Sequence, residues 1–390
     1  MISREDLRQL AGFECRLPDE FAISFYFEPG TPKDKSHREE VIEAKDLVRK
    51  TLQELELSGR HRNAISDLQR ILQVVEALRG NQARAKAVFA CAAREFWKEF
   101  DLPPGLGGSR LFVNRRFHLK PVAPVVSDHP PLWVAVLDRQ NARFLEVEFD
   151  SVKEQGTISN ILPRHGRSDG FAGYNGGHAE RHLEGEFRRH FQEAAEFLKA
   201  AVERKLFDAL VIGCQDISWP EIEAQLHPDV KKKLLGTFSA ELTALNNEKA
   251  AEGGRRVARE AVTKRHHQLL GAALDGARSN GRGVTGLRRV LRATEQGEVD
   301  TIIMSRDYSA RAVECTNCRH LDSHLVPYCP ACGRSTRQLD DVCEALVPLV
   351  VRNSLGLVLL PPDETLNRVG NIAAVLRFRA DQNVNQMLAS

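Results

Sequence analysis

Long hydrophobic runs are missing from this chain of 390 residues. No apolar stretch approaches the roughly 18 residues that a membrane-spanning helix needs. The N-terminal segment MISREDLRQLAGFECRL also lacks the apolar core of a secretory signal peptide. The composition, with 42% hydrophobic and 28% charged residues, is that of an ordinary globular protein. These absences argue against a membrane protein and lead us to expect a cytoplasmic one.

A strong net charge is also missing, since the formal value is only +2. Any nucleic-acid binding must therefore come from a local patch. Neither a G-x-S-x-G nucleophile elbow nor a G-x-x-x-x-G-K-[ST] phosphate loop is present. GRGVTG at 281–286 matches G-x-G-x-x-G, but helical spacing precedes it where a dinucleotide fold needs a strand. We expect only a turn and the start of a helix there.

Cysteine is sparse outside one cluster. Of the eight cysteines, those at 15, 91, 214 and 343 stand alone, and we expect each to be a small buried residue. The other four form CTNC and CPAC, two C-x2-C knuckles with ten residues between them. Two such knuckles complete a closed tetrahedral site for structural Zn²⁺ and leave no position for a catalytic water. The predicted ligands are Cys315, Cys318, Cys329 and Cys332.

The cysteine cluster also permits two alternatives to a metal site. The four residues would form two disulfides, or they would pack as apolar side chains without a metal. A cytoplasmic location disfavours disulfides. We therefore predict a zinc ribbon at about 311–337.

Strands alternating with helices predict an α/β (α+β) fold with layered domains. Strands are expected at 21–27 and 207–214. Helices are expected at 36–57, 63–80, 178–205 and 220–250. The segment 121–131 contains four prolines and marks a boundary. We predict three domains, 1–126, 127–262 and 263–390, the last an α/β sandwich with the ribbon inserted.

Glycines are concentrated in GFAGYNGGHAERHLEGEFRRHF, residues 170–191. Gly176 and Gly177 allow a partner to approach the backbone closely. The following helix carries Arg181, Arg188 and Arg189, which suit phosphate contacts. This pattern favours RNA as the partner, and a plain linker is the alternative. His178 and His182 are four residues apart, but the glutamate between them is misplaced for a zinc protease, so we expect solvated histidines.

These motifs resemble the archaeo-eukaryotic release factor and Pelota family, and more narrowly its bacterial ribosome hibernation factors of the Balon type. The resemblance rests on NGGHAERHLEGEFRRHFQEAAEFL followed by FDALVIGC, and on GEVDTIIM through GNIAAVLRF. FAISFYF, NAISDLQRI and SRLFVNRRFHLKPV match the layout of the family's first domain. The resemblance implies a three-domain factor that reaches from the decoding centre to the peptidyl-transferase centre.

Two departures from the family pattern shape the functional expectation. The codon-reading Asn-Ile-Lys-Ser is replaced by Asn63, Ala64, Ile65 and Ser66, without a lysine. The glutamine of the Gly-Gly-Gln tip is replaced by His178. The resemblance therefore implies a non-catalytic factor in the vacant ribosomal A site, contacting ribosomal RNA but neither DNA nor membrane. Elongation factor Tu is an implied partner.

Two alternatives to this expectation remain. One is a codon-independent rescue factor that hydrolyses peptidyl-tRNA through Gly176, Gly177 and His178, the histidine acting as a general base. The other is an RNA-binding adaptor unrelated to the A site. The expected RNA contacts are Gly176, Gly177, His178, Arg181, Arg188, Arg189, Asn63 and Ser66.

Overall fold

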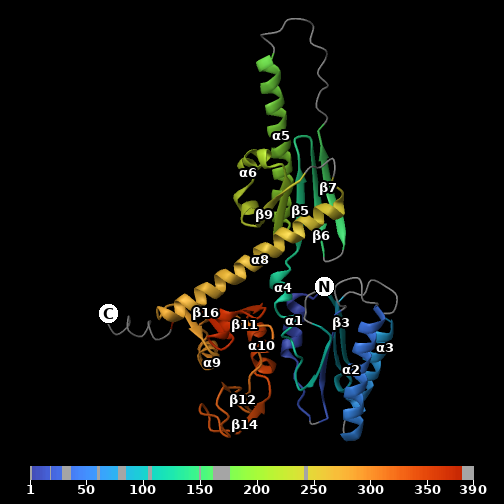
Figure 1. Cartoon of the computed structure of the whole chain (residues 1–390), viewed down its shortest axis with the longest axis vertical. Coiled ribbons are helices and arrows are strands. Elements are labelled where there is room, and N and C mark those ends of the chain that lie inside the picture. Colours follow the sequence, from blue (N-terminus) through green and yellow to red (C-terminus); the bar gives the residue numbers. More distant parts are fainter. Residues whose placement is uncertain are drawn as a thin grey trace. The chain divides into compact units, whose positions relative to one another are not determined.

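The computed structural model describes residues 2–17, 19–28, 37–58, 62–77, 85–103, 108–148, 151–160, 176–240 and 245–379. The chain forms two compact units, one made of 1–128 with 266–390 and one made of 129–265 (Figure 1). The predicted mixed α/β class with several sheets is confirmed. The division into three domains stays a prediction. None of the helices in these ranges is long and apolar enough to cross a membrane.

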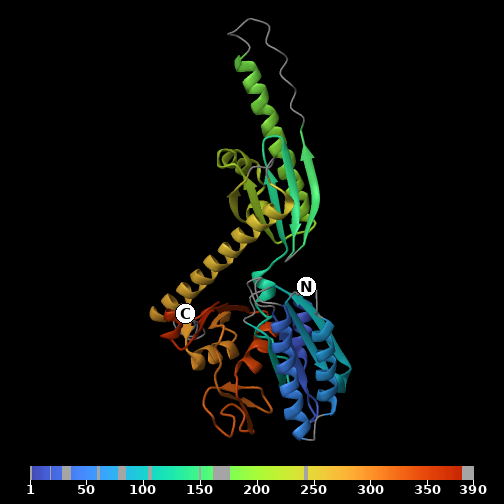
Figure 2. The ribbon, with the colours of Figure 1, turned by 45° about the vertical axis from the view of Figure 1, so that its right-hand side comes forward.

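The N-terminal part of the first unit is an antiparallel sheet in the order β3-β2-β1-β4. Its strands are β1 (Ala22–Phe27), β2 (Ala85–Cys91), β3 (Phe96–Leu102) and β4 (Arg110–Asn114). Helices α2 (His37–Ser58) and α3 (Arg62–Ala77) lie side by side on one face (Figure 2). Alternate residues of β1, namely Ile23, Phe25 and Phe27, are buried against them. The predicted strand and helix pair are therefore present.

Short elements complete this part of the first unit. Helix α1 (Arg4–Gly12) begins with a capping box in which Ser3 and Asp6 bond to each other's backbone amides. The 3₁₀ turn η1 (Ala92–Arg94) follows β2, and α4 (Val125–Asp128) precedes the second unit. Cys15 and Cys91 are buried as expected, but they are not isolated, because their Sγ atoms are 3.9 Å apart.

The C-terminal part of the first unit has a sheet in the order β10-β16-β11-β15. Its elements are β10 (Gly283–Thr285), α9 (Leu287–Glu295), β11 (Val299–Ser305), α10 (Cys343–Arg352), β15 (Gly356–Leu360), α11 (Glu364–Asn367) and β16 (Ile372–Leu376). A separate small sheet, β12 (Ala312–Cys315), β13 (Leu321–Asp322) and β14 (Thr336–Leu339), is inserted between β11 and α10. GRGVTG contains strand β10, which was not expected, and ends at Gly286, the N-cap of α9, where the helix start was expected.

The second unit is a five-stranded sheet in the order β7-β6-β5-β8-β9. Strands β5, β8 and β9 run parallel, while β6 and β7 continue as an antiparallel meander. The strands are β5 (Leu132–Leu137), β6 (Asn141–Val147), β7 (Val152–Ser159), β8 (Ala209–Cys214) and β9 (Leu234–Ser239). Helices α5 (Gly176–Glu203), α6 (Trp219–Gln225) and α7 (Pro228–Lys231), with the 3₁₀ turn η2 (Asp216–Ser218), lie on one side.

Helix α8 (Asn247–Arg278) covers the other face of this sheet with its N-terminal half. A Cβ placed on Gly254 would lie 2.2 Å from a methyl group of Val134. The helix therefore packs directly on β5 because glycine leaves room for it. The predicted helix at 220–250 is wrong, since β9 interrupts it. Strand β9 is half exposed, so its apolar pattern is too weak to predict a strand. It forms because it pairs in parallel with β8, which is a tertiary effect.

Candidate metal centre and arginine-bearing stem

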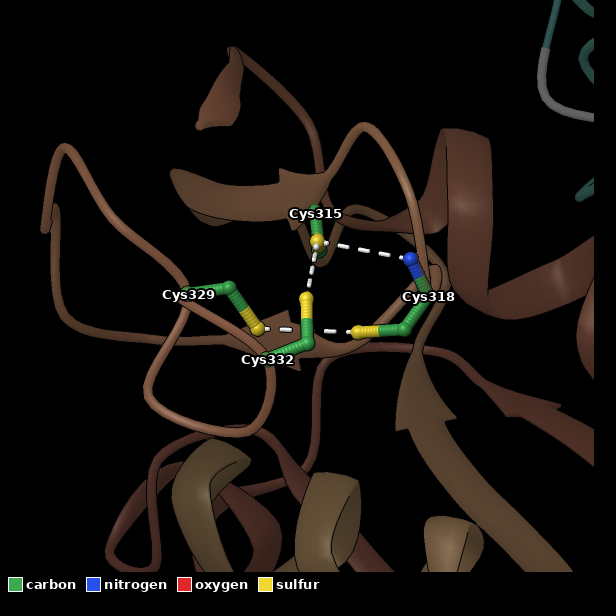
Figure 3. Close-up of side chains that lie close together, drawn as sticks. All are labelled: Cys315, Cys318, Cys329 and Cys332. Carbon is green, nitrogen blue, oxygen red and sulfur yellow. Dashed lines mark hydrogen bonds between the residues drawn. The ribbon is translucent and has the colours of Figure 1, made fainter. Parts of the chain in front are cut away.

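The four cysteines of the ribbon, residues 311–337, meet at one point (Figure 3). All four sulfur atoms lie within 4.8 Å of one another. The Sγ atoms of Cys315 and Cys332 are 3.4 Å apart, and those of Cys318 and Cys329 are 3.6 Å apart. A disulfide needs about 2.05 Å. The edge of a tetrahedron with metal–sulfur bonds of about 2.3 Å is about 3.8 Å. The arrangement therefore fits a metal ion and contradicts the two-disulfide alternative.

Backbone turns direct the thiols inward. The amides of Asn317 and Cys318 donate to Cys315 Sγ at 3.4 Å, and the amide of Ala331 donates to Cys329 Sγ at 3.4 Å. The residue after each knuckle, Arg319 or Gly333, has a positive φ of 65° or 72°. Only the second of these residues is a glycine, so the first knuckle adopts the left-handed conformation without one.

Cys315 combines burial with amide contacts. Burial alone would raise the pKa of its thiol, but the amide hydrogen bonds outweigh it and lower the pKa to about 6. A thiol ionised near neutral pH is the form that binds a metal. Four sulfur ligands are the set that structural Zn²⁺ prefers, and they leave no open position for catalysis.

A buried ion network lies at the base of the ribbon. Glu314, next to Cys315, has a side chain only 4% exposed and accepts two bonds from Arg116, at 2.8 and 3.1 Å. Arg337 bonds to the same carboxylate at 2.6 Å. Arg116, whose side chain is 5% exposed, also bonds to Glu14 at 2.8 Å. The network joins the ribbon to the N-terminal part of the same unit, and sequence reasoning missed it.

The ribbon makes a second contact with the N-terminal part, in which Arg319 bonds to Glu14. The two guanidinium nitrogens of Arg319 each lie 2.7 Å from a carboxylate oxygen of Glu14. Burial would raise the pKa of Glu14, but Arg319 and Arg116 outweigh it and hold the pKa below its usual value. Arg319 directly follows the metal-site cysteine Cys318. The metal site and the paired bonds to Glu14 therefore belong to one turn of the backbone.

Helix α5 places the predicted glycine-rich tip at its start. Gly176 and Gly177 are its first two residues, where the sequence led us to expect the helix from His178. The N-terminal turns of α5 extend beyond the end of the sheet (Figure 1). The side chains of His178 and Arg181 lie outside the described residues, as does the loop at 161–175. Their roles stay predictions.

The part of α5 that follows, residues 184–203, is here named the stem. Arg188 is exposed, and no described residue forms an ion pair with it. Arg189 has a side chain 68% exposed and one long contact, 3.5 Å, to Glu186. The guanidinium of Arg139 lies 4.9 Å from the ring centre of Phe187 on the stem. Arginines therefore gather on this end of the second unit.

Arg139, in the turn DRQN between β5 and β6, was missed by sequence reasoning. Asp138 Oδ1 accepts bonds from the amides of Gln140 and Asn141, at 2.8 and 2.7 Å, and these fix the turn. The turn sets Arg139 against the stem through a cation–π contact. The sequence did hold a signal for an exposed arginine, because a residue at the tip of a hairpin faces solvent. Its contact with Phe187 could be known only from the fold.

The other predicted RNA contacts lie on α3 of the first unit. Asn63 and Ser66 are exposed and three residues apart, so they share one face of the helix. Ala64 is buried. Asp67 is also buried, and its carboxylate accepts the Ala92 amide at 2.6 Å. Burial raises the pKa of Asp67 to about 6. The structure thus leaves Asn63 and Ser66 free to contact a partner.

Comparison with known proteins shows which family the chain resembles. The sequence model described as "Bacterial archaeo-eukaryotic release factor family 10" matches residues 118–266. This segment of the chain therefore resembles the archaeo-eukaryotic release factors. The chain is 23% identical over 290 residues to the peptide chain release factor subunit 1 of Archaeoglobus fulgidus. The alignment covers 70% of this chain and 71% of that protein. The predicted resemblance to the release factor and Pelota family is confirmed, and the narrower resemblance to Balon-type hibernation factors stays a prediction.

Solved structures of similar proteins align with most of the chain. The crystal structure of the archaeal termination factor aRF1 aligns with 97% of this chain and 99% of its own, at 14% identity and a TM-score of 0.26. Dom34 of S. cerevisiae, a translation termination-like factor interacting with Hbs1, aligns with 98% of this chain and 94% of its own, at 10% identity and a TM-score of 0.40.

Proposed function

We propose that this protein is a translation factor that occupies the vacant ribosomal A site and holds the ribosome idle. The observation that carries the proposal is the family match over 118–266, because that segment includes the glycine pair and the stem. The tip has His178 where the family has glutamine. Close backbone approach at the glycines is retained, while the side chain that the family uses for peptide release is not.

The stem supports an RNA partner. Arg188 and Arg139 are exposed, and both belong to the end of the second unit from which the first turns of α5 extend. Guanidinium groups in this position suit phosphate oxygens of ribosomal RNA. Gly176, Gly177, His178 and Arg181 would then form the leading part of the same contact, on the side of the peptidyl-transferase centre.

Helix α3 supports binding without codon reading. Asn63 and Ser66 present short polar groups on its exposed face, and the family's lysine is missing between them. Short polar side chains still bond to RNA at the decoding centre. The proposed factor therefore occupies the A site regardless of the codon.

The ribbon and elongation factor Tu have supporting places in this proposal. Zn²⁺ held by the four cysteines would fix the fold of the ribbon and take no part in a reaction. Elongation factor Tu is the proposed delivery partner, by resemblance to the Balon-type hibernation factors.

Cosedimentation with ribosomes tests the proposal. The full chain should bind bacterial ribosomes that have an empty A site, and A-site tRNA should displace it. Ribosomes carrying peptidyl-tRNA should keep their peptide when the protein binds. His178→Ala should leave binding nearly unchanged, because the histidine only lies at the tip.

The rescue alternative gives the opposite result in the same assay. Histidine can act as a general base near neutral pH, and the glycine pair is retained. If wild-type protein releases peptide, and His178→Ala stops release while binding persists, the protein is a rescue factor. Binding that A-site tRNA does not displace would instead favour an RNA adaptor acting elsewhere.

A further inference from the structure

The outer loop of the ribbon, residues 323–335, exposes large apolar side chains. Tyr328 is 68% exposed and is the most exposed aromatic residue in the described part of the chain. Leu325, three positions before it, is 54% exposed. No described residue stacks on Tyr328 or bonds to its hydroxyl group. A tyrosine this exposed offers much of its ring to a partner.

The backbone holds Tyr328 rigidly. It forms an antiparallel bridge with Ser335. On one side of it the amide of Cys329 donates to the carbonyl of Arg334 at 2.7 Å, and on the other the amide of Thr336 donates to the carbonyl of Pro327 at 3.0 Å. Cys329 is also a candidate metal ligand. The ring therefore stands on a preorganised hairpin, so binding to it costs little conformational entropy.

The charges around this loop suit a polyanion. Residues 323–335 contain no aspartate or glutamate, and their charged groups are Arg334 and the titratable His324. Arg334 is exposed and forms no ion pair with a described residue. Of the nearby carboxylates, Glu314 bonds to two arginines, and Asp322 lies 3.0 Å from the ring of His324. Both carboxylates of the ribbon, Glu314 and Asp322, therefore have a basic side chain beside them.

We infer that Tyr328 is a stacking platform for a base of single-stranded RNA, with Arg334 contacting the adjacent backbone. An aromatic ring and a cation on one short hairpin without carboxylates are the composition that single-stranded nucleic-acid sites share. The alternative partner is a protein, whose pocket would bind Leu325 and Tyr328 together as an apolar anchor. Such a pocket does not require the absence of aspartate and glutamate around the tyrosine. On the ribosome the base would belong to ribosomal RNA, and to that extent the inference rests on the proposed function.

Crosslinking identifies what touches Tyr328. The photoreactive residue p-benzoylphenylalanine is placed at position 328 in the full chain, which is then irradiated with ribosomes and, separately, with a short single-stranded RNA of mixed sequence. RNA adducts should form in both cases. Adducts with ribosomal protein alone, and none with the free RNA, would overturn the inference.

Substitution gives the affinity. Tyr328→Ala should weaken binding to the single-stranded RNA roughly 5- to 150-fold, the range measured for loss of one stacked base. Tyr328→Phe should bind like wild type, because it keeps the ring, and Leu325→Ala should change binding little. Equal losses in Leu325→Ala and Tyr328→Ala would instead indicate an apolar protein pocket. Zinc content must stay at the wild-type level in each variant, because Cys329 is the next residue.

The two proposals fail separately. If the wild-type chain does not sediment with ribosomes but still binds RNA through Tyr328, the proposed function is wrong and this inference stands. If it sediments with ribosomes and the ring at 328 has no effect on RNA binding, the inference is wrong and the proposed function stands.

Discussion

The ribbon of the first unit and the stem of the second differ in how their charges are neutralised. At the base of the ribbon, Glu314 and Arg116 are buried and satisfied by partners within the chain. On the stem, Arg188 has no partner in the described residues and Arg189 has one long contact. Charge in the first region therefore holds the fold together. Charge in the second is available to another molecule, and mutations in the two regions should separate stability from binding.

Loss of the metal should have the largest effect. Cys315→Ser removes one of four thiolates, and apparent binding free energies of structural zinc sites are about 10–16 kcal/mol near neutral pH. Wild-type protein should contain about one Zn²⁺ per chain and the variant almost none, with unfolding of the ribbon. Metal analysis and protease digestion measure this. Cys214→Ser, which changes a buried cysteine of the second unit, should keep the metal, and zinc-free wild-type protein with an intact ribbon would contradict the prediction.

Breaking the ion network should come next. Arg116→Ala leaves the buried carboxylate of Glu314 without its main partner, and losses of this kind cost about 3–5 kcal/mol. Urea denaturation should show the loss in the first unit. Arg278→Ala, which breaks a solvent-exposed pair with Asp275, should change the free energy of unfolding by less than about 1 kcal/mol.

A second variant checks the cause of that loss. Arg116→Met combined with Glu314→Leu removes both charges and should recover part of the stability, because no buried charge is left unpaired. If the double variant is as unstable as Arg116→Ala, packing rather than charge accounts for the effect.

Two glycines of α8 test the scaffold behind the stem. Gly254→Ala would force a methyl group to 2.2 Å from Val134, so the second unit should lose about 1–3 kcal/mol. Gly271→Ala, on the same helix, meets nothing within 4 Å and should stabilise by roughly 0.5–1 kcal/mol through helix propensity. Thermal unfolding of the two variants should therefore shift in opposite directions, and shifts of the same sign would contradict the packing of α8 on β5.

The smallest effect on stability, and the clearest one on binding, is expected from the stem. Arg188→Ala with Arg189→Ala should leave unfolding unchanged and should lower the salt dependence of ribosome binding by a slope of roughly 1–2. Lys199→Ala with Arg204→Ala removes the same charge near the far end of α5 and should leave that slope unchanged. Equal effects of the two pairs would mean that overall charge, rather than a stem contact, governs binding.

The ribbon was predictable because cysteine spacing carries its own geometry. Two C-x2-C knuckles place four thiols together whatever surrounds them, and the sulfur positions agree. The alternation in β1 and the helical periodicity of α5 were likewise local signals. RNA contacts at His178 and Asn63 rested on resemblance, and the structure alone does not test them.

What the sequence did not predict depends on contacts between distant residues. The bonds of Arg116 to Glu314 and of Arg319 to Glu14 span 198 and 305 positions, and no local pattern marks the partners. Strand β9 forms because it pairs with β8. Cys15 and Cys91 come into contact only when the N-terminal sheet folds. Helix α8 continues through residue 262, where we expected a domain to end.

The ion network also sets an order of events during synthesis. Arg116 leaves the ribosome 198 residues before Glu314, which at about 5–20 residues per second is roughly 10–40 s. During that interval the guanidinium has Glu14 as its only partner from the network. The earliest-made domain can therefore bury Arg116 fully only after the ribbon has been translated. In a nascent chain that stalls before residue 314, Arg116 would stay exposed to water. The ribbon therefore completes the buried ion network of the N-terminal part.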